Sequence, residues 1–420
     1  MYLERTIERH VHAAAGEFPV VVVTGPRQAG KTTMLRRVVG EQAGYVSLDV
    51  PDVRAAAIAD PRSFLAAWRP PVILDEVQQA PELLPYLRAA VDEARELPGR
   101  YILSGSQNLL LLQRVTETLA GRAAILRLLP LSLRESVGLP HAPLPWEQPP
   151  RPDRPATIDP SCAYGGLWER LVRGFYPELV AHPSRSASRW YASYVQTYLE
   201  RDVRAVRQVG DLSAFQAFVR SLAARTSQQL NLSEVGRDVG VPAATCRTWL
   251  SVLEATHQIA IVRPFFANLG KRLVKSPKVY FMDTGMVCHL CGITTARQAA
   301  DGPMAGALFE TAVVVEAMKS AHHRFTDPRQ FFWRTAEGRE VDMVLETADG
   351  LAPVEVKPGA TPRPAMASGI EAFRREYGPR TTRGFMVHTG DTVLPLGPDA
   401  LALPFGWMGG ADAPANLSLG

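Results

Sequence analysis

The segment that most constrains the fold is a glycine-rich loop that ends in lysine and threonine. Its residues, in order, are Gly25, Pro26, Arg27, Gln28, Ala29, Gly30, Lys31 and Thr32. Residues 20–23, all valine, predict a buried strand before the loop, and residues 33–39 predict a helix after it. A glycine-rich turn between strand and helix presents backbone N–H groups to phosphate oxygens, and the helix dipole adds positive potential. The sequence therefore predicts a P-loop that binds a nucleoside triphosphate.

Two side chains of this loop carry the chemistry that a triphosphate site needs. Lys31 can reach the β and γ phosphates, and the Thr32 hydroxyl can bind Mg²⁺. Thr33, the next residue, is included with the loop among the nucleotide-binding residues. A nucleoside triphosphate and Mg²⁺ are the cofactors that these residues predict.

A second motif predicts that the bound triphosphate is also hydrolysed. Residues 71–76 form an apolar run that ends in Asp75 and Glu76, as in a buried parallel strand that delivers acids to the edge of a sheet. We expect Asp75 to hold Mg²⁺ through water and Glu76 to polarise the attacking water, because phosphoryl transfer depends on a positioned nucleophile. The alternative is an ordinary strand that ends in a solvated acidic turn. Residues 101–108 predict a neighbouring strand, whose Ser106 or Gln107 would contact the γ phosphate or orient the water.

Length and composition indicate a multi-domain enzyme. The 420 residues suggest two to three domains, and 46% hydrophobic content supplies sizeable cores. No segment approaches the ~20 apolar residues of a membrane span, and four cysteines in so long a chain suggest no disulfide framework. We therefore expect a cytoplasmic protein without a membrane partner. The net charge of +4 decides little about partners.

Boundaries divide the chain into five parts. Residues 1–137 form the predicted nucleotide-binding core, and the proline-rich residues 138–160 an exposed linker or insertion. Residues 161–210 read as helical, 211–285 as a winged helix-turn-helix, and 300–405 as a further α/β domain. Basic residues of the fourth part can meet DNA phosphates, although the same module often only packs proteins together. These predicted DNA contacts are Arg247, Arg263, Lys271, Arg272, Lys275 and Lys278.

The last domain carries a different set of charged residues. Glu310 lies on an apolar helix, Asp342 on a strand, and Glu355 and Lys357 on one face of the next strand. Two carboxylates could hold Mg²⁺ while Lys357 positions a hydrolytic water. The alternatives are a half-buried hairpin with exposed charges, or a nuclease fold that does not cut. This layout resembles the PD-(D/E)XK nuclease core, and the resemblance implies a candidate nuclease site at Glu310, Asp342, Glu355 and Lys357.

Nearly the whole chain resembles one family, the prokaryotic AAA-type ATPases with a C-terminal PD-(D/E)XK nuclease-like domain. The resemblance rests on the P-loop and on residues 74–76, 104–107, 119–122, 198–202, 275–285, 332–335, 340–342 and 355–357. The proline-rich segment is longer than the family leads one to expect, which leaves the domain junction open. The implied fold class is α/β: a P-loop AAA-type core with a parallel sheet, then a helical and winged-helix region, then an α/β nuclease-like domain.

The resemblance also implies activity and assembly. It implies that the base of the bound nucleotide is adenine rather than guanine, and that Ser106 acts as a sensor residue. It also implies a homo-oligomer, with a hexamer as one form, in which Arg122 is an arginine finger toward the nucleotide of the neighbouring subunit. The alternative for Arg122 is a charge that complements the end of a helix. Two function classes remain. The basic run from Arg263 to Lys278 favours an ATPase coupled to duplex or branched DNA. The alternative is a nucleotide-gated signalling switch that acts on a protein partner, with a nuclease-like domain that does not cut.

Overall fold

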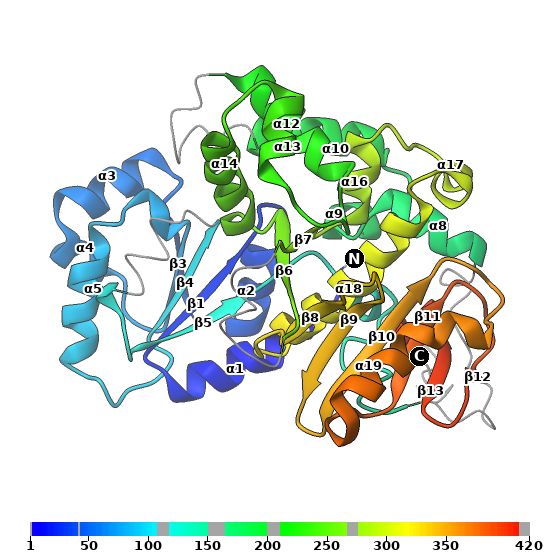
Figure 1. The fold of residues 1–420 in the computed structure, drawn as a ribbon. Coiled ribbons are helices and arrows are strands. Elements are labelled where there is room, and N and C mark those ends of the chain that lie inside the picture. The colour runs from blue at the N-terminus through cyan, green and yellow to red at the C-terminus, as the bar shows by residue number, and fades with distance from the viewer. Residues whose placement is uncertain are drawn as a thin grey trace.

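The computed structural model describes residues 2–40, 43–106, 117–149, 164–199, 211–266 and 276–410. Figure 1 shows the first unit in blue and cyan, a helical unit in green, and a second sheet in yellow to red. Among the described residues, no helix combines the length and the apolar character that crossing a bilayer requires. Three of the predicted DNA contacts, Lys271, Arg272 and Lys275, lie outside the described residues.

The first unit is a five-stranded parallel sheet in the order β2-β3-β4-β1-β5. Its strands are apolar along their length because helices bury both faces, as expected of a parallel sheet. Leu83, Leu84 and Leu87 cover one face, and Val11, Met34 and Leu35 cover the other. The strands are β1 (Val20–Gly25), β2 (Gly44–Ser47), β3 (Val72–Asp75), β4 (Tyr101–Ser106) and β5 (Ala123–Arg127). The helices are α1 (Glu8–Glu17), α2 (Lys31–Val39), α3 (Pro51–Ala59), α4 (Pro61–Ala67), α5 (Leu83–Asp92) and the 3-10 turn η1 (Val77–Gln79).

A helical unit follows, and an aromatic group lies at its centre. The rings of Tyr176, Trp190 and Tyr194 contact one another with centroids 4.8–5.1 Å apart. The helices are α7 (Leu133–Ser136), α8 (Tyr164–Arg173), α9 (Pro177–Ala181), α10 (Ala187–Tyr194), the π-helix η3 (Val195–Leu199), α12 (Leu212–Ala223), α13 (Leu232–Val239), α14 (Ala243–Ala255), α16 (Thr284–Leu290) and α17 (Ala296–Asp301).

The second sheet has eight strands in the order β12-β13-β11-β10-β9-β8-β6-β7. The long helix α18 packs on one face and α19 on the other. The strands are β6 (Ile259–Pro264), β7 (Lys278–Phe281), β8 (Gln330–Arg334), β9 (Glu340–Thr347), β10 (Gly350–Lys357), β11 (Gly384–His388), β12 (Leu394–Pro395) and β13 (Ala400–Pro404). The helices are α18 (Ala305–His323), α19 (Ser368–Tyr377) and the 3-10 turns η4 (Pro364–Ala367), η5 (Gly378–Arg380) and η6 (Phe405–Gly409).

The hairpin expected as the wing is continuous with the C-terminal sheet. β6 pairs antiparallel with β7 and also parallel with β8, through Arg263↔Phe331 and Pro264↔Phe332. The helices α13 and α14 with this hairpin keep the order expected of a helix-turn-helix with a wing. The sheet therefore crosses the predicted boundary between residues 285 and 300.

The predicted exposed linker is only partly exposed. In its described part, residues 138–149, the Pro140 carbonyl accepts a hydrogen bond of 2.6 Å from Thr6 Oγ1, and Leu144 is buried. Glu147 forms an ion pair with Arg324 at the end of α18. Prolines exclude helix and strand here, but they do not prevent the segment from packing against the rest of the chain. The expectation that the segment is exposed was therefore wrong for residues 138–149.

Candidate functional site

The P-loop leaves the carboxyl end of β1 and enters α2, as the sequence predicted. Gly25 and Gly30 have φ of +151° and +90°. A Cβ atom on Gly25 would lie 1.9 Å from the Leu128 carbonyl oxygen, so only glycine fits beside β5. Gln28 also has a positive φ, of +63°, which gives the loop its curvature.

Lys31 lies across this loop. Its Nζ donates hydrogen bonds to the carbonyl oxygens of Gly25, at 3.0 Å, and of Pro26, at 2.9 Å. The ammonium is buried at the first turn of α2, and these two bonds use two of its three N–H donors. Thr33, predicted as a binding residue, is exposed on α2.

Asp75 is the best-held carboxylate of the site. Its Oδ2 accepts hydrogen bonds from the Thr32 hydroxyl, at 2.9 Å, and from the Tyr45 hydroxyl, at 2.8 Å. Its Oδ1 accepts from the Ser104 hydroxyl on β4. Carboxylate and hydroxyl oxygens are the ligands that Mg²⁺ prefers, so Thr32 and Asp75 fit the predicted magnesium site. Tyr45 and Ser104 were not predicted.

Glu76 follows Asp75 with φ +56°, in the left-handed region. Its carboxylate accepts a hydrogen bond from the Gln78 side chain, while its backbone N–H donates to Asp75 Oδ1 at 3.1 Å. Such a φ is uncommon outside glycine, and strained residues of this kind cluster at functional sites. Ser106 ends β4, but its side chain lies outside the described residues, as does Gln107.

Arg122 lies in the turn before β5, at the sheet edge opposite the P-loop. Its guanidinium binds both carboxylate oxygens of Asp92, at 2.6 and 3.0 Å, within the same chain. This ion pair lowers the pKa of the Asp92 carboxyl. To act as an arginine finger, Arg122 would have to leave Asp92 and bind the nucleotide of a neighbouring subunit. This role stays a prediction.

The backbone of the P-loop is also held by residues from outside the first sheet. Arg5 Nη1 donates to the Ala29 carbonyl at 2.9 Å, and Arg5 Nη2 donates to the Leu129 carbonyl at 2.7 Å. The Tyr194 hydroxyl, on α10, donates to the Arg27 carbonyl at 3.5 Å and accepts from the Gln258 amide at 3.1 Å. Two carbonyls of the phosphate loop therefore touch distant parts of the chain.

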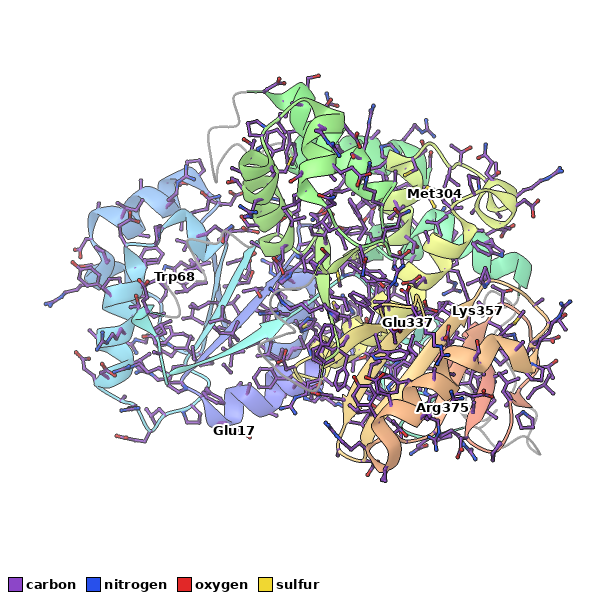
Figure 2. All side chains as sticks on the ribbon, in the orientation of Figure 1. Glu17, Trp68, Met304, Glu337, Lys357 and Arg375 are labelled. Atoms are coloured by element: carbon purple, nitrogen blue, oxygen red, sulfur yellow. The ribbon has the colours of Figure 1, made fainter. Side chains whose placement is uncertain are left out.

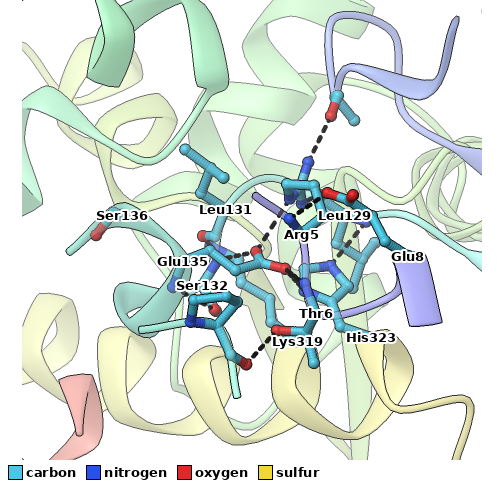
Figure 3. Close-up of polar contacts among 12 residues, drawn as sticks. Arg5, Thr6, Glu8, Leu129, Leu131, Ser132, Glu135, Ser136, Lys319 and His323 are labelled. Atoms are coloured by element: carbon cyan, nitrogen blue, oxygen red, sulfur yellow. Dashed lines mark hydrogen bonds and ion pairs between the residues drawn. The ribbon is translucent and has the colours of Figure 1, made fainter. Parts of the chain in front are cut away.

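Figure 3 shows the buried network in which Arg5 lies. Its Nε is 3.2 Å from Glu135 Oε2, and Glu135 Oε1 is 3.1 Å from His323 Nδ1. Since the Leu129 N–H donates to His323 Nε2 at 3.1 Å, we assign the proton of the neutral ring to Nδ1. Burial lowers the pKa of His323, which agrees with a neutral ring. Burial would raise the pKa of Glu135, but Arg5 and His323 outweigh it and hold this pKa well below its usual range.

The candidate nuclease residues do meet, in a pocket of about 880 Å³ on the second sheet. Figure 2 labels Lys357 and Arg375 on this unit, which is distant from the unit of Trp68. Lys357 Nζ lies 2.7 Å from Glu355 Oε2 and 3.8 Å from Asp342 Oδ2. Burial raises the pKa of Glu310 and, with the neighbouring Asp342 carboxylate, that of Glu355. Among the described residues, however, no three carboxylate, histidine or cysteine side chains are arranged to hold a metal ion.

The prediction that Lys278 contacts DNA was wrong. Its side chain is 4% exposed, and its Nζ lies 2.9 Å from Glu310 Oε1 and 2.6 Å from Glu340 Oε1. A lysine that is buried and paired in this way cannot meet a DNA phosphate. Arg247 on α14 and Arg263 on β6 are exposed and remain available as predicted contacts.

Three family models match successive parts of the chain. Residues 17–137 match an AAA domain, residues 165–297 a domain of unknown function (DUF8612), and residues 305–407 a second domain of unknown function (DUF4143). Two mycobacterial proteins are each 30% identical to the chain over 401 residues, which is 95% of this chain and 82% of each relative. They are "Uncharacterized protein Mb2031c" of Mycobacterium bovis and "Uncharacterized protein Rv2008c" of Mycobacterium tuberculosis. The chain belongs to the family of these two proteins.

Within this family the first unit is a P-loop AAA-type ATPase core, as predicted. Two solved structures are similar to the chain at low identity. The Walker-type ATPase PABY2304 of Pyrococcus abyssi is 15% identical, with a TM-score of 0.41 over 69% of this chain and 96% of that one. A single-substitution variant of RuvB from Thermotoga maritima is 14% identical, with a TM-score of 0.27 over 60% of this chain and 88% of that one. The nuclease-like character of the C-terminal unit stays a prediction.

Proposed function

We propose that this protein is a Mg²⁺-dependent ATP hydrolase. The observation that supports it is the juxtaposition of Lys31, Thr32 and Asp75 at the carboxyl edge of a parallel sheet, with Thr32 and Asp75 joined by a hydrogen bond of 2.9 Å. Ligands of open parallel sheets bind at this edge. The P-loop N–H groups and Lys31 would hold the phosphates, and a bound Mg²⁺ would neutralise charge on the β and γ phosphates.

Glu76 would position the attacking water. It directly follows Asp75, and its positive φ turns its side chain away from the course of β3. In the structure its carboxylate accepts a hydrogen bond from Gln78, and it would accept a further one from the attacking water. Hydrolysis then depends on where this carboxylate lies more than on its basicity.

Steady-state ATP hydrolysis and calorimetric binding of Mg²⁺-ATP test this assignment. Lys31→Ala should weaken binding at least about tenfold, because charge-assisted hydrogen bonds to phosphate are lost. Glu76→Gln should bind ATP as the wild type does and lose turnover. Arg88→Ala, an exposed change on α5, serves as the control. Unchanged ATP affinity in Lys31→Ala would refute the P-loop assignment, and normal turnover in Glu76→Gln would exclude that residue.

We further propose that the ATP site works as a nucleotide-gated switch on the rest of the chain. The Ala29 and Arg27 carbonyls of the phosphate loop bind Arg5 and Tyr194. A phosphate that draws the Lys31 ammonium toward it would alter its bonds to the Gly25 and Pro26 carbonyls, and so would change the loop to which Arg5 and Tyr194 are attached. The Arg5–Glu135–His323 contacts continue from there to α18.

Coupling to DNA is the second candidate, and the order α13–α14–β6–β7 favours it, since it is that of a winged helix. The exposed face of α14 carries Ala244, Arg247, Ser251 and Glu254, however, and so offers one basic and one acidic side chain. A phosphate-binding face is usually more basic. We therefore place the switch first.

ATP turnover with and without duplex, single-stranded and branched DNA, at two salt concentrations, separates these candidates. The switch predicts turnover that does not respond to DNA. Stimulation that fades with salt, and that Arg247→Ala weakens, would favour DNA coupling instead. Mixing Arg122→Ala with Lys31→Ala tests the proposed oligomer: partial recovery of turnover would support a finger that acts between subunits, and no recovery would argue against it.

A further inference from the structure

The ATP site leaves one motif of the sequence unexplained, residues 275–285, which crosses β7. Lys278 and Tyr280 are two residues apart on this strand and so lie on one face of it. Lys278 Nζ contacts Glu310 Oε1 and Glu340 Oε1, at 2.9 and 2.6 Å. The Tyr280 hydroxyl donates to the same Glu310 oxygen at 2.6 Å. Both side chains therefore point at the acid of the C-terminal pocket.

These two residues reach the pocket from outside the C-terminal domain. β7 is hydrogen-bonded to β6 at the end of the eight-stranded sheet, whereas Glu310 is on α18 and Glu340 begins β9. The Lys278 ammonium also lies 5.4 Å from the centre of the Phe332 ring, a cation–π contact. The lysine is therefore held from several sides and is 4% exposed.

Two lysines already contact the carboxylates of the pocket without an added ion. Its lining includes the carboxylates of Glu310, Glu340, Asp342 and Glu355. Lys278 binds the first two, and Lys357 binds Glu355 and approaches Asp342. Sites for divalent cations instead keep several oxygen ligands free to face the ion. The residues do not fit a metal centre in this arrangement.

We propose that Lys278 is a tethered cation that takes the place of a divalent metal ion at Glu310, so that the pocket of the intact protein excludes metal. This assigns a role to the Lys278–Tyr280 segment, and it does not depend on the ATPase assignment. The lysine directs its ammonium at the carboxylates that an ion would need, and Tyr280 completes the hydrogen bonding of Glu310.

The Lys278 ammonium lies 2.9 Å from the Glu310 carboxylate and 2.6 Å from the Glu340 carboxylate, so two negative groups hold it in this position. An incoming divalent ion would meet a like charge at close range and would find the Glu310 oxygen engaged by two donors. Removing the lysine charge takes one donor from Glu310 and one from Glu340, and it removes the like charge that such an ion would meet.

Mn²⁺ binding to the full chain, measured by calorimetry and by electron paramagnetic resonance without nucleotide, tests the proposal. The wild type should bind no Mn²⁺ in this pocket, so Asp342→Asn should leave its Mn²⁺ binding unchanged. Lys278→Met should gain one such site, with affinity at least about tenfold above any wild-type binding there, because a like charge has been deleted. Adding Asp342→Asn to Lys278→Met should remove the site again. Mn²⁺ bound at the P-loop is recognised separately, because Asp75→Asn abolishes it.

Arg339→Met is the matched control, since it deletes a positive charge from the lining of the same pocket, and the described contacts of this side chain do not include Glu310. It should bind Mn²⁺ as the wild type does. A wild-type Mn²⁺ site that Asp342→Asn removes would overturn the proposal. So would a folded Lys278→Met, verified by its melting curve, that gains no site. If Lys278→Met does not fold, Lys278→Arg keeps the charge and should remain metal-free, and Mn²⁺ binding there would refute the idea.

Discussion

At the scale of single residues, Asp75 accepts hydrogen bonds from side chains of three different elements. Thr32 comes from α2, Tyr45 from β2 and Ser104 from β4. The contact between Asp75 and Thr32 was predictable, because both residues were expected to bind the same magnesium ion. Tyr45 and Ser104 were not, since their approach depends on the order β2-β3-β4, and hydroxyl residues carry no signal of strand order.

Ser104→Ala should lower the Mg²⁺ affinity of the nucleotide site by about tenfold. The serine orients the Asp75 carboxylate, and partners that orient a metal ligand typically contribute this much. The Mg²⁺ dependence of ATP hydrolysis measures the effect. Ser63→Ala, on the distant α4, is the control, and a Ser104→Ala curve that overlays the wild type would contradict the role.

Arg5→Ala should destabilise the protein by about 3 kcal/mol or more, because Glu135 would be left buried without its charged partner. Urea unfolding measures this loss. Arg9→Ala, an exposed change on α1, should shift the midpoint little. Equal midpoints for the two variants would show that the buried contacts of Arg5 contribute no more than a surface charge.

At the scale of elements, α16 shows how one residue of a sequence motif joins several helices. Asp283 caps α16 by accepting from the Met286 N–H at 3.0 Å. The same carboxylate accepts from the Phe175 N–H, at 2.7 Å, and from the Tyr191 hydroxyl. Motif residue Asp283 therefore serves packing of the helical unit.

Asp283→Ala should cost at least about 3 kcal/mol of unfolding free energy, because three donors lose a charged acceptor. Asp211→Ala removes the N-cap of α12, which accepts from one backbone N–H at the surface, and should cost about 1 kcal/mol. Urea denaturation of both variants gives the comparison. A cost for Asp283→Ala no larger than that for Asp211→Ala would reduce its role to that of a simple cap.

The strands and helices near the motifs were predicted well, and their long-range pairing was not. β1, β3 and β4 begin within a residue of the expected positions, because buried parallel strands read as continuous apolar runs. The pairing of β6 with β8 joins residues far apart in the chain, and no local pattern encodes it. Lys278 was misjudged for this reason: as part of a basic run it suggests a surface, and only the sheet brings it to Glu310.

At the scale of the whole molecule, histidines that are partly buried between units make stability depend on pH. Burial, and then the charges of Arg127, His322 and Lys31, lower the pKa of His257 to about 3. Burial, and then Arg127 and His323, lower the pKa of His322 to about 3 as well. When folding lowers the pKa of a histidine, the stability that the neutral ring contributes is fully present above its pKa in the unfolded chain, near 6.5. This stability is lost as the pH falls toward the folded pKa of about 3.

His322→Gln should therefore lose less stability than the wild type when the pH falls from 7.5 to 5.5, by roughly 1 kcal/mol. Urea unfolding at both pH values measures the difference. The raised pKa values of Glu310 and Glu355 act in the opposite direction, but they are common to both proteins. His12→Gln, an exposed change, is the control, and parallel pH curves for His322→Gln and the wild type would contradict the expectation.

The contacts of Arg5 also set an order of events during synthesis. Arg5 leaves the ribosome early, Glu135 emerges long afterwards, and His323 emerges only when about three quarters of the 420 residues have been made. Until then the nascent chain carries a phosphate loop whose supporting cation is not yet enclosed. Domains generally fold as units while they emerge, but this one waits for a helix encoded far downstream. A fragment that stops at residue 137 would thus carry the phosphate loop without its full support, and would not be a smaller version of the whole protein.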